Sequence, residues 1–244
     1  MGGGSWQAFY ASDAQGVYAL LPVPALFLAF WLLRAARRRR AGEPALRFLG
    51  LWAPLFALET LLDPLVSGLF ARALGLEGAA SLALLIPFVL LGDFRIYWLL
   101  FALGDPEARP GPAAARAACW TLLVPLAALA LFFGAVRSLA PGAPGQGIWL
   151  VYELGFCGVA LWLRRRWVPE LGGIGARRAR CLRLVLCYVL CYYALWAACD
   201  VAILFFSLDA AWALRALPNQ LYYAFTVPFV WAAVQRACAE SADR

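Results

Sequence analysis

The stretch Ala80–Leu103 reads ASLALLIPFVLLGDFRIYWLLFAL and decides the fold class. At about 1.5 Å per helical residue, it is long enough to cross the roughly 30 Å of hydrocarbon in a bilayer. Asp93 and Arg95 are its only charged residues. An apolar stretch of this length predicts a transmembrane helix, and two charges at its centre require a structural or functional reason.

The rest of the chain repeats this pattern. Of 244 residues, 64% are hydrophobic and only 14% are charged, which is far from the composition of soluble proteins. We therefore expect an all-α, polytopic membrane protein with seven transmembrane helices and no room for a soluble catalytic domain. The expected spans are about residues 17–33, 47–70, 80–103, 117–136, 147–163, 182–208 and 211–234.

Missing residue types exclude several kinds of chemistry. The chain has no histidine, and all 21 basic residues are arginine. Imidazole ligation of haem or zinc, histidine base catalysis and a lysine Schiff base are therefore excluded. The seven cysteines lie in or beside apolar segments, where we expect reduced thiols that pack between helices. We expect no metal, no cofactor and no catalytic residues.

The arginines predict the orientation, because loops rich in positive charge stay on the cytoplasmic side. Seventeen arginines flank the expected spans on one side, and only Arg72, Arg137 and Arg215 flank them on the other. The N-terminus is then outside and the C-terminus cytoplasmic, and we expect a bacterial inner membrane as the location. Met1–Gly16 has no basic region, so the first span is expected to remain as an anchor.

The net charge of +7 arises mainly at these cytoplasmic flanks. Anionic lipid is the expected partner of the cluster Arg37, Arg38, Arg39 and Arg40, because arginine side chains at the membrane surface attract lipid phosphates. We do not expect nucleic acid as a partner. The sequence does not determine the oligomeric state, and association into an oligomer stays open.

The sequence also indicates an internal duplication. Three pairs of matching segments share an offset of 131 residues: Gln15–Tyr18 with Gln146–Trp149, Ala29–Leu32 with Ala160–Leu163, and Pro87 with Pro218. Asp63 matches Asp200 at an offset of 137 residues. We therefore divide the chain into a first three-helix repeat (1–103), a linker that contains the fourth span (104–140) and a second three-helix repeat (141–244).

In this arrangement the chain resembles the SWEET sugar transporters and the wider PQ-loop group, in which a linker helix joins two three-helix bundles. The resemblance implies parallel repeats related by an axis along the membrane normal, with a substrate site at their interface. The proline-glutamine dipeptide of that group is absent here. The nearest sequence is Pro218-Asn219-Gln220.

Polar residues inside the expected spans form the candidate site. A set in the outer half of the membrane is expected to bind a small polar solute or a coupling proton in a hydrated cavity: Asp63, Asp200, Glu153, Asn219, Gln220 and Tyr223. We expect Asp200 to face the bundle interior beside Asn219 or Tyr223. Deeper in the membrane, Glu59, Asp93 and Arg95 are expected to pair their charges.

Three classes of function are compatible with these residues. Duplicated, kinked helices around a polar cavity favour a small transporter or permease for a polar or cationic solute. The alternative is a non-transporting membrane sensor, lipid-binding scaffold or complex subunit. The third class is an intramembrane enzyme that acts on a lipid-linked substrate through a carboxylate pair. One cavity that touches both Asp63 and Asp200 would favour transport, whereas a dry bundle with every carboxylate paired would favour a scaffold.

The orientation can be tested with reporters fused to the chain. A reporter after Arg244 is expected in the cytoplasm, and one inserted near Pro144 outside, because of the arginine distribution. Accessibility of the two reporters to a membrane-impermeant reagent in intact cells measures this. A reporter on the opposite side at either position would show that the predicted orientation is wrong.

Overall fold

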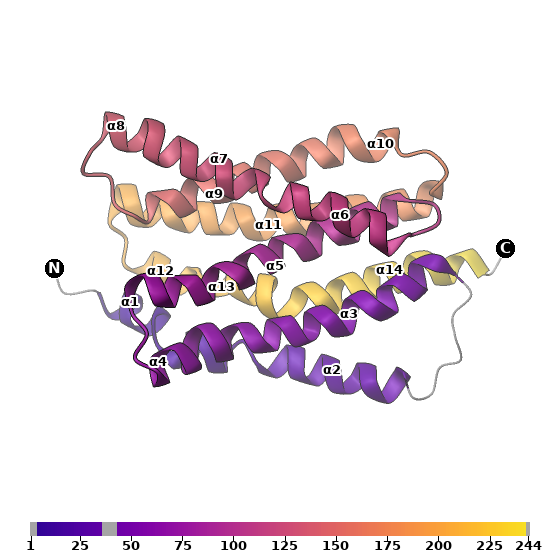
Figure 1. Ribbon diagram of the computed structural model, residues 1–244, viewed down its shortest axis with the longest axis horizontal. Coiled ribbons are helices and arrows are strands. Elements are labelled where there is room, and N and C mark those ends of the chain that lie inside the picture. Colours follow the sequence, from indigo (N-terminus) through magenta and orange to yellow (C-terminus); the bar gives the residue numbers. More distant parts are fainter. Residues whose placement is uncertain (1–3, 36–42, 243–244) are drawn as a thin grey trace.

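The computed structural model describes residues 4–35 and 43–242 of the chain. In these ranges the protein is all-helical, and no strand occurs. The long helices run side by side along one axis and form an elongated bundle (Figure 1). The cluster Arg37, Arg38, Arg39 and Arg40, for which we expected anionic lipid as the partner, lies outside the described residues.

The part of the chain before the fourth span begins with short helices. Longer helices follow, and π-helical stretches, labelled η, lie between some of the helices. In chain order the elements are α1 (Ser5–Tyr10), η1 (Ala14–Tyr18), α2 (Pro22–Ala35), α3 (Pro44–Asp63), η2 (Pro64–Phe70), α4 (Ala71–Ala73) and α5 (Gly78–Gly104).

The rest of the chain adds the helices at the top and centre of Figure 1. Their order is α6 (Pro110–Thr121), α7 (Leu123–Leu131), η3 (Phe132–Val136), α8 (Arg137–Leu139), α9 (Gly147–Trp162), η4 (Leu163–Trp167), α10 (Val168–Glu170), α11 (Gly175–Phe206), α12 (Ala210–Leu214), α13 (Ala216–Asn219), η5 (Gln220–Phe225) and α14 (Thr226–Ala242).

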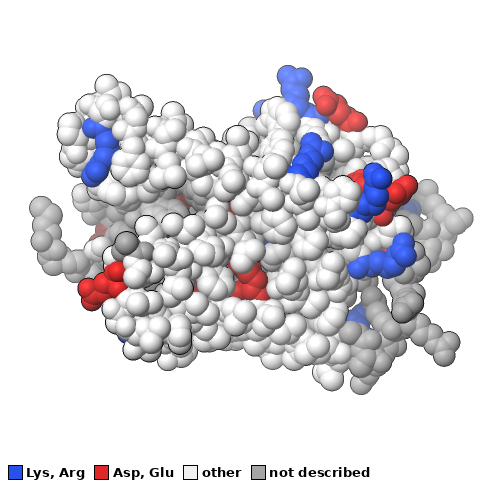
Figure 2. All heavy atoms as spheres, in the orientation of Figure 1, with Lys and Arg blue, Asp and Glu red and all other residues white. Residues whose placement is uncertain are grey.

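The two ends of the bundle differ in charge. We call the end that carries α1, α4, α8 and α12 the amino-terminal end; it lies on the left in Figure 1. Arginine and acidic side chains gather at the opposite end, which we call the arginine-rich end (Figure 2). There Arg178 donates to the backbone oxygen of Asp105 at 3.1 Å. A hydrogen bond of 2.7 Å from Arg109 to Asp105 lowers the pKa of this carboxyl.

Six helical segments of the described chain are long and apolar enough to cross a membrane, so the protein is an integral membrane protein as expected. They are Ala14–Arg34, Pro44–Ala73, Ala80–Gly104, Pro110–Leu139, Gly147–Glu170 and Gly175–Phe206. Between the two ends the surface in Figure 2 is mostly uncharged, apart from one acidic patch near the middle of the view. Large apolar residues of the spanning helices, among them Leu26, Leu126 and Phe205, are exposed and would face lipid.

The seventh expected span, residues 211–234, is not among these six. It is helical for most of its length, and α14 packs against α3 and α11. Asn219, Gln220 and the tyrosines after them make this segment more polar than the other six. The seventh membrane crossing, the orientation of the termini and the duplication therefore stay predictions.

Two spans begin earlier than expected. α11 starts at Gly175 instead of residue 182, so its first turns contain Arg177, Arg178, Arg180 and Arg183. Arginine has a high helix propensity, so a helix continues readily beyond the apolar stretch. α6 starts at Pro110 instead of residue 117, because proline fits the first turn of a helix.

Prolines shape the helices around the polar residues. Pro64 has no N–H to donate, and the helix continues beyond it as the π-helical stretch η2. Pro218 likewise precedes η5, which carries Tyr222 and Tyr223. Interruptions of this kind leave backbone oxygens free to accept other hydrogen bonds.

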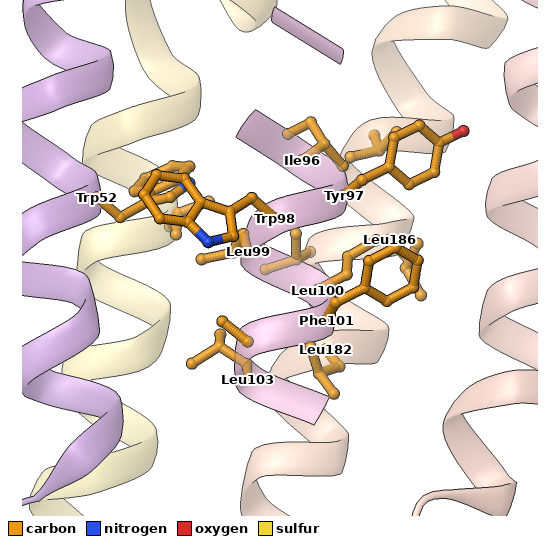
Figure 3. Close-up of a cluster of buried hydrophobic side chains, with 14 of the residues drawn as sticks. Trp52, Ile96, Tyr97, Trp98, Leu99, Leu100, Phe101, Leu103, Leu182 and Leu186 are labelled. Carbon is orange, nitrogen blue, oxygen red and sulfur yellow. The ribbon is translucent and has the colours of Figure 1, made fainter. Parts of the chain in front are cut away.

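The core lies around the second half of α5. Leu99 and Leu100 are fully buried there, with Leu182 and Leu186 of α11 beside them. Figure 3 shows Trp98 directed towards Trp52 of α3, with Tyr97 and Phe101 on the opposite side of α5. This core occupies the half of the bundle nearer the arginine-rich end.

Shortening a core side chain tests this packing. Leu99→Ala removes a fully buried side chain and is expected to lower the free energy of unfolding by about 2–5 kcal/mol. The matched control is Leu126→Ala on α7, where the side chain is 58% exposed and little packing is lost. Unfolding of the purified protein in detergent measures both. Equal effects of the two substitutions would contradict the described core.

Candidate functional site

Arg95 lies at the centre of the bundle and is fully buried. Its guanidinium donates to the carboxylate of Glu59 on α3 at 3.2 Å and to the backbone oxygen of Tyr222 in η5 at 2.6 Å. The guanidinium also lies 4.3 Å from the centre of the Tyr222 ring. One side chain of α5 therefore joins α3 and η5 through a buried charge, as expected for Glu59 and Arg95.

The backbone around Arg95 is fixed by two neighbours. The indole N–H of Trp52 donates to the backbone oxygen of Arg95 at 2.9 Å. One turn earlier, the hydroxyl of Tyr222 lies so close to Gly92 that a Cβ atom there would overlap it. Glycine at position 92 is therefore required for the close approach of η5 to α5.

Asp93 is fully buried and does not bond to Arg95. Its carboxylate instead accepts from the hydroxyls of Tyr152 on α9 at 2.6 Å and Tyr193 on α11 at 2.9 Å. Buried carboxylates require such donors, because an ionised group without partners is costly in an apolar interior. α5 is therefore linked to α3 and η5 by Arg95 and to α9 and α11 by Asp93.

A second charged cluster lies nearer the amino-terminal end. Asp200 of α11 is fully buried, forms an ion pair with Arg215 and accepts from the side chain of Gln146 at 2.9 Å. Arg215 also lies 3.7 Å from one oxygen of Glu153 on α9, while the other oxygen, Oε2, is buried without a hydrogen-bond partner. Two carboxylates therefore share one guanidinium.

This cluster corrects two expectations. Arg215 was counted with the outer loops, but it lies at the break between α12 and α13 and is only 8% exposed. Counting arginines by loop treats each one as solvent-exposed, so this count could not indicate that Arg215 is paired inside the bundle. Asp200 faces the interior as expected, but its bonding partners are Arg215 and Gln146 instead of Asn219 or Tyr223.

Tyr10 of α1 is a site residue that sequence reasoning missed. Its hydroxyl accepts from Arg215 at 3.4 Å and from Asn219 at 3.2 Å, and its ring lies 5.5 Å from that of Trp212. The N–H groups of Trp6 and Gln7 donate to the carboxylate of Asp209, which fixes α1 on α12. A helix of six residues gives no periodic signal that could have revealed this contact.

Asp63 and Gln220 lie apart from the second cluster. Ser67, one turn further along, donates to a carboxylate oxygen of Asp63 at 2.8 Å. The side chain of Gln220 donates to the backbone oxygen of Ala19 at 2.9 Å, which ties η5 to the region between η1 and α2. In these contacts Gln220 serves the packing of helices, whereas Asp63 lies at the edge of a small cavity.

Two cavities lie in this half of the molecule, and they share Tyr10, Asn219 and Tyr223 as lining residues. The smaller has a volume of about 140 Å³ and is lined by Asp63 and Ser67. The larger has a volume of about 310 Å³. Its other lining residues are Leu85, Val89, Gln146, Trp149, Tyr152, Glu153, Tyr193, Trp196, Trp212, Arg215 and Tyr222.

The larger cavity therefore brings together four of the expected site residues, Glu153, Asn219, Tyr223 and, through Arg215, Asp200. Asp63 is separated from it and lines only the smaller cavity. Neither of these two cavities is lined by both Asp63 and Asp200. What the larger cavity offers chemically is aromatic walls and the carboxylate group of Glu153, which shares its guanidinium partner with Asp200.

The central pair can be tested by charge removal. Glu59→Gln leaves the buried guanidinium of Arg95 without its counter-ion, so we expect a loss of about 3–5 kcal/mol in the free energy of unfolding. The matched control is Glu107→Gln, because Glu107 is 73% exposed and only 3.5 Å from Arg109. A surface pair of this kind contributes about 0–1 kcal/mol. Unfolding in detergent measures both, and a small effect of Glu59→Gln would show that Arg95 does not depend on this pair.

Comparisons with known proteins assign no family to this chain. No protein-family model matches the sequence, and no curated protein or solved structure matches it either. The resemblance to the SWEET and PQ-loop proteins therefore remains an expectation based on the repeat pattern. The function has to be inferred from the cavity and the charged residues around it.

Proposed function

We propose that this chain is a small membrane transporter or permease that binds a polar or cationic solute in the larger cavity. The observation that carries the proposal is the cavity itself, which combines a volume of about 310 Å³ with the carboxylate group of Glu153 among its lining residues. Sites for small molecules typically have volumes of about 300–1,000 Å³ and a few polar groups on apolar walls. We expected one cavity of a transporter to touch both Asp63 and Asp200, and neither the larger nor the smaller cavity does, so the proposal rests on the larger cavity alone.

The position of the cavity along α5 supports transport. Leu85 and Val89 line the cavity, and Arg95 with its partners follows two turns later. Beyond Arg95 lies the buried core around Leu99 and Leu100 (Figure 3), and two further cavities, of about 360 and 460 Å³, follow at the arginine-rich end. A packed core between a cavity towards one end of the bundle and cavities at the other end is what one state of an alternating-access transporter requires.

Prolines in the lining helices supply hinges for the change to a second state. Pro87 lies between the two residues of α5 that line the cavity, and Pro218 precedes the lining residues of η5. Helices bend at proline because one backbone hydrogen bond is missing there. Opening towards the arginine-rich end would then require α5 and the α13–η5 segment to bend away from the Arg95 cluster.

A non-transporting sensor is the second candidate. Tyr10 of α1 bonds with Arg215 and Asn219 at the edge of the cavity, so a bound solute could be reported by a shift of α1 without crossing the membrane. The central charges also have partners, as expected for a scaffold. Transport and sensing differ in whether a solute passes through the protein.

Flux measurements separate these candidates. In proteoliposomes, the wild type is expected to exchange at least one solute from a panel of radiolabelled sugars, amino acids and organic cations faster than empty liposomes. Asp200→Asn is expected to reduce this flux at least tenfold. Without the charge of Asp200, the guanidinium of Arg215 neutralises Glu153 instead. The matched control is Asp105→Asn at the arginine-rich end, which is expected to leave flux unchanged.

Thermal unfolding and gel filtration establish that each variant is folded. If Asp200→Asn is not folded, Glu153→Gln replaces it, because Arg215 keeps Asp200 as a partner in that variant. No flux by the wild type for any solute would favour the sensor or scaffold. Flux that is unchanged in both variants would show that the second charged cluster has no part in transport.

A further inference from the structure

The interior of the bundle carries more negative than positive groups. Seven buried charged residues occur in the described chain: the carboxylates Glu59, Asp63, Asp93, Glu153 and Asp200, and the arginines Arg95 and Arg215. The central arginine is matched by Glu59, and Arg215 is matched by Asp200. Glu153 lines the larger cavity and shares Arg215 at 3.7 Å, while its other oxygen is buried without a hydrogen-bond partner.

Aromatic rings make up most of the wall of the larger cavity. The larger cavity is lined by three tryptophans and five tyrosines: Trp149, Trp196, Trp212, Tyr10, Tyr152, Tyr193, Tyr222 and Tyr223. The negative face of an aromatic ring attracts a cation, and tryptophan attracts it most strongly. A carboxylate among aromatic rings is therefore a site for a positively charged group.

Arg215 shows that this wall already accommodates a cation. The centre of its guanidinium lies 5.6 Å from the ring of Tyr10 and 5.7 Å from the ring of Trp212. Both rings line the cavity. A solute cation deeper in the same cavity would contact the other tryptophans and lie beside the carboxylate group of Glu153.

The hydrogen-bonding groups of the wall select among cations. The hydroxyls of Tyr152 and Tyr193 donate to Asp93, and the side-chain oxygen of Asn219 accepts from Trp196 at 2.9 Å. The hydrogens of these two hydroxyls and the oxygen of Asn219 are therefore engaged, which leaves fewer free donors for the hydroxyls of a sugar, whereas the lone pairs of the tyrosines remain available. A cation surrounded by alkyl groups has no N–H donors to satisfy and gains from contact with the rings.

We infer that the larger cavity binds an alkylated ammonium ion, with Glu153 as its counter-ion and the tryptophan and tyrosine rings as its cage. This assignment deepens the proposed transport function and rests on it for the statement that the ion is carried across the membrane. Binding itself does not depend on transport, so the two can be tested separately.

The binding test uses a pair of probes that differ only in charge. Choline carries a trimethylammonium group, and 3,3-dimethylbutan-1-ol is its uncharged carbon analogue. Calorimetric titration of the detergent-purified protein is expected to give at least tenfold tighter binding of choline, because only the cation is attracted by Glu153 and the rings. Equal binding of the two probes, or no binding of choline, would overturn the inference.

Variants identify the groups responsible. Glu153→Gln is expected to weaken choline binding at least tenfold and to leave binding of the uncharged analogue unchanged. Trp149→Leu removes one cage ring and is expected to weaken choline binding about fivefold, within the usual range for a cation–π contact. The controls are Glu107→Gln and Trp162→Leu, which replace exposed residues away from the cavity. Loss of binding in the controls, or normal choline binding by folded Glu153→Gln, would show that the site is elsewhere.

Radiolabelled choline in proteoliposomes separates this inference from the proposed function. Binding in detergent without flux would support the cation site and contradict transport. Flux of an uncharged solute by a protein that does not bind choline would support transport and overturn the cation site. Saturable choline flux that is lost in Glu153→Gln would support both.

Discussion

The arrangement of the helices depends on the burial of one guanidinium. Arg95 is surrounded by an apolar bundle, so its charge and its hydrogen-bond donors must be satisfied by the protein itself. Glu59 supplies the charge, and Tyr222 supplies both a backbone oxygen and a ring. These contacts fix α3 and η5 against α5. Gly92 permits the approach, because any side chain there would overlap Tyr222.

The two charged clusters differ in how completely their partners are defined. Around Arg95 and Asp93, short hydrogen bonds from three other helices and η5 hold each group in one place. Around Arg215, one guanidinium serves Asp200 closely and Glu153 more loosely. A side chain shared between two carboxylates can redistribute between them at little cost when another cation arrives. The cluster around Arg95 and Asp93 therefore suits a structural role, and the cluster around Arg215 suits binding.

The sequence predicted what depends on local composition. Apolar length alone indicated six of the spans that the structure contains, and the charges inside them identified Glu59, Arg95, Glu153 and Asp200 as residues in need of partners. The partners Arg215 and Tyr10 were not predictable, because Tyr10 approaches its contacts across more than two hundred residues of chain. Such contacts are set by how helices pack, and no local pattern records them. The start of α11 among arginines was not predicted for a related reason. Hydropathy indicates which residues lie in the membrane, and it does not indicate where the helix begins.

The site is also less symmetric than the expected duplication implies. Asp63 and Asp200 would occupy matching positions in the two expected repeats, yet Asp63 bonds to Ser67 on its own helical segment, whereas Asp200 pairs with an arginine from another element. Residues of α9, α11 and the α12–η5 segment form most of the larger cavity, and from the first repeat only α1 and α5 contribute lining residues. If the two halves arose by duplication, the charged pair and the aromatic wall belong to the second half. In that case the residues that select a solute lie in the second half. In the first half, Arg95 and the core of α5 hold the helices of the bundle together.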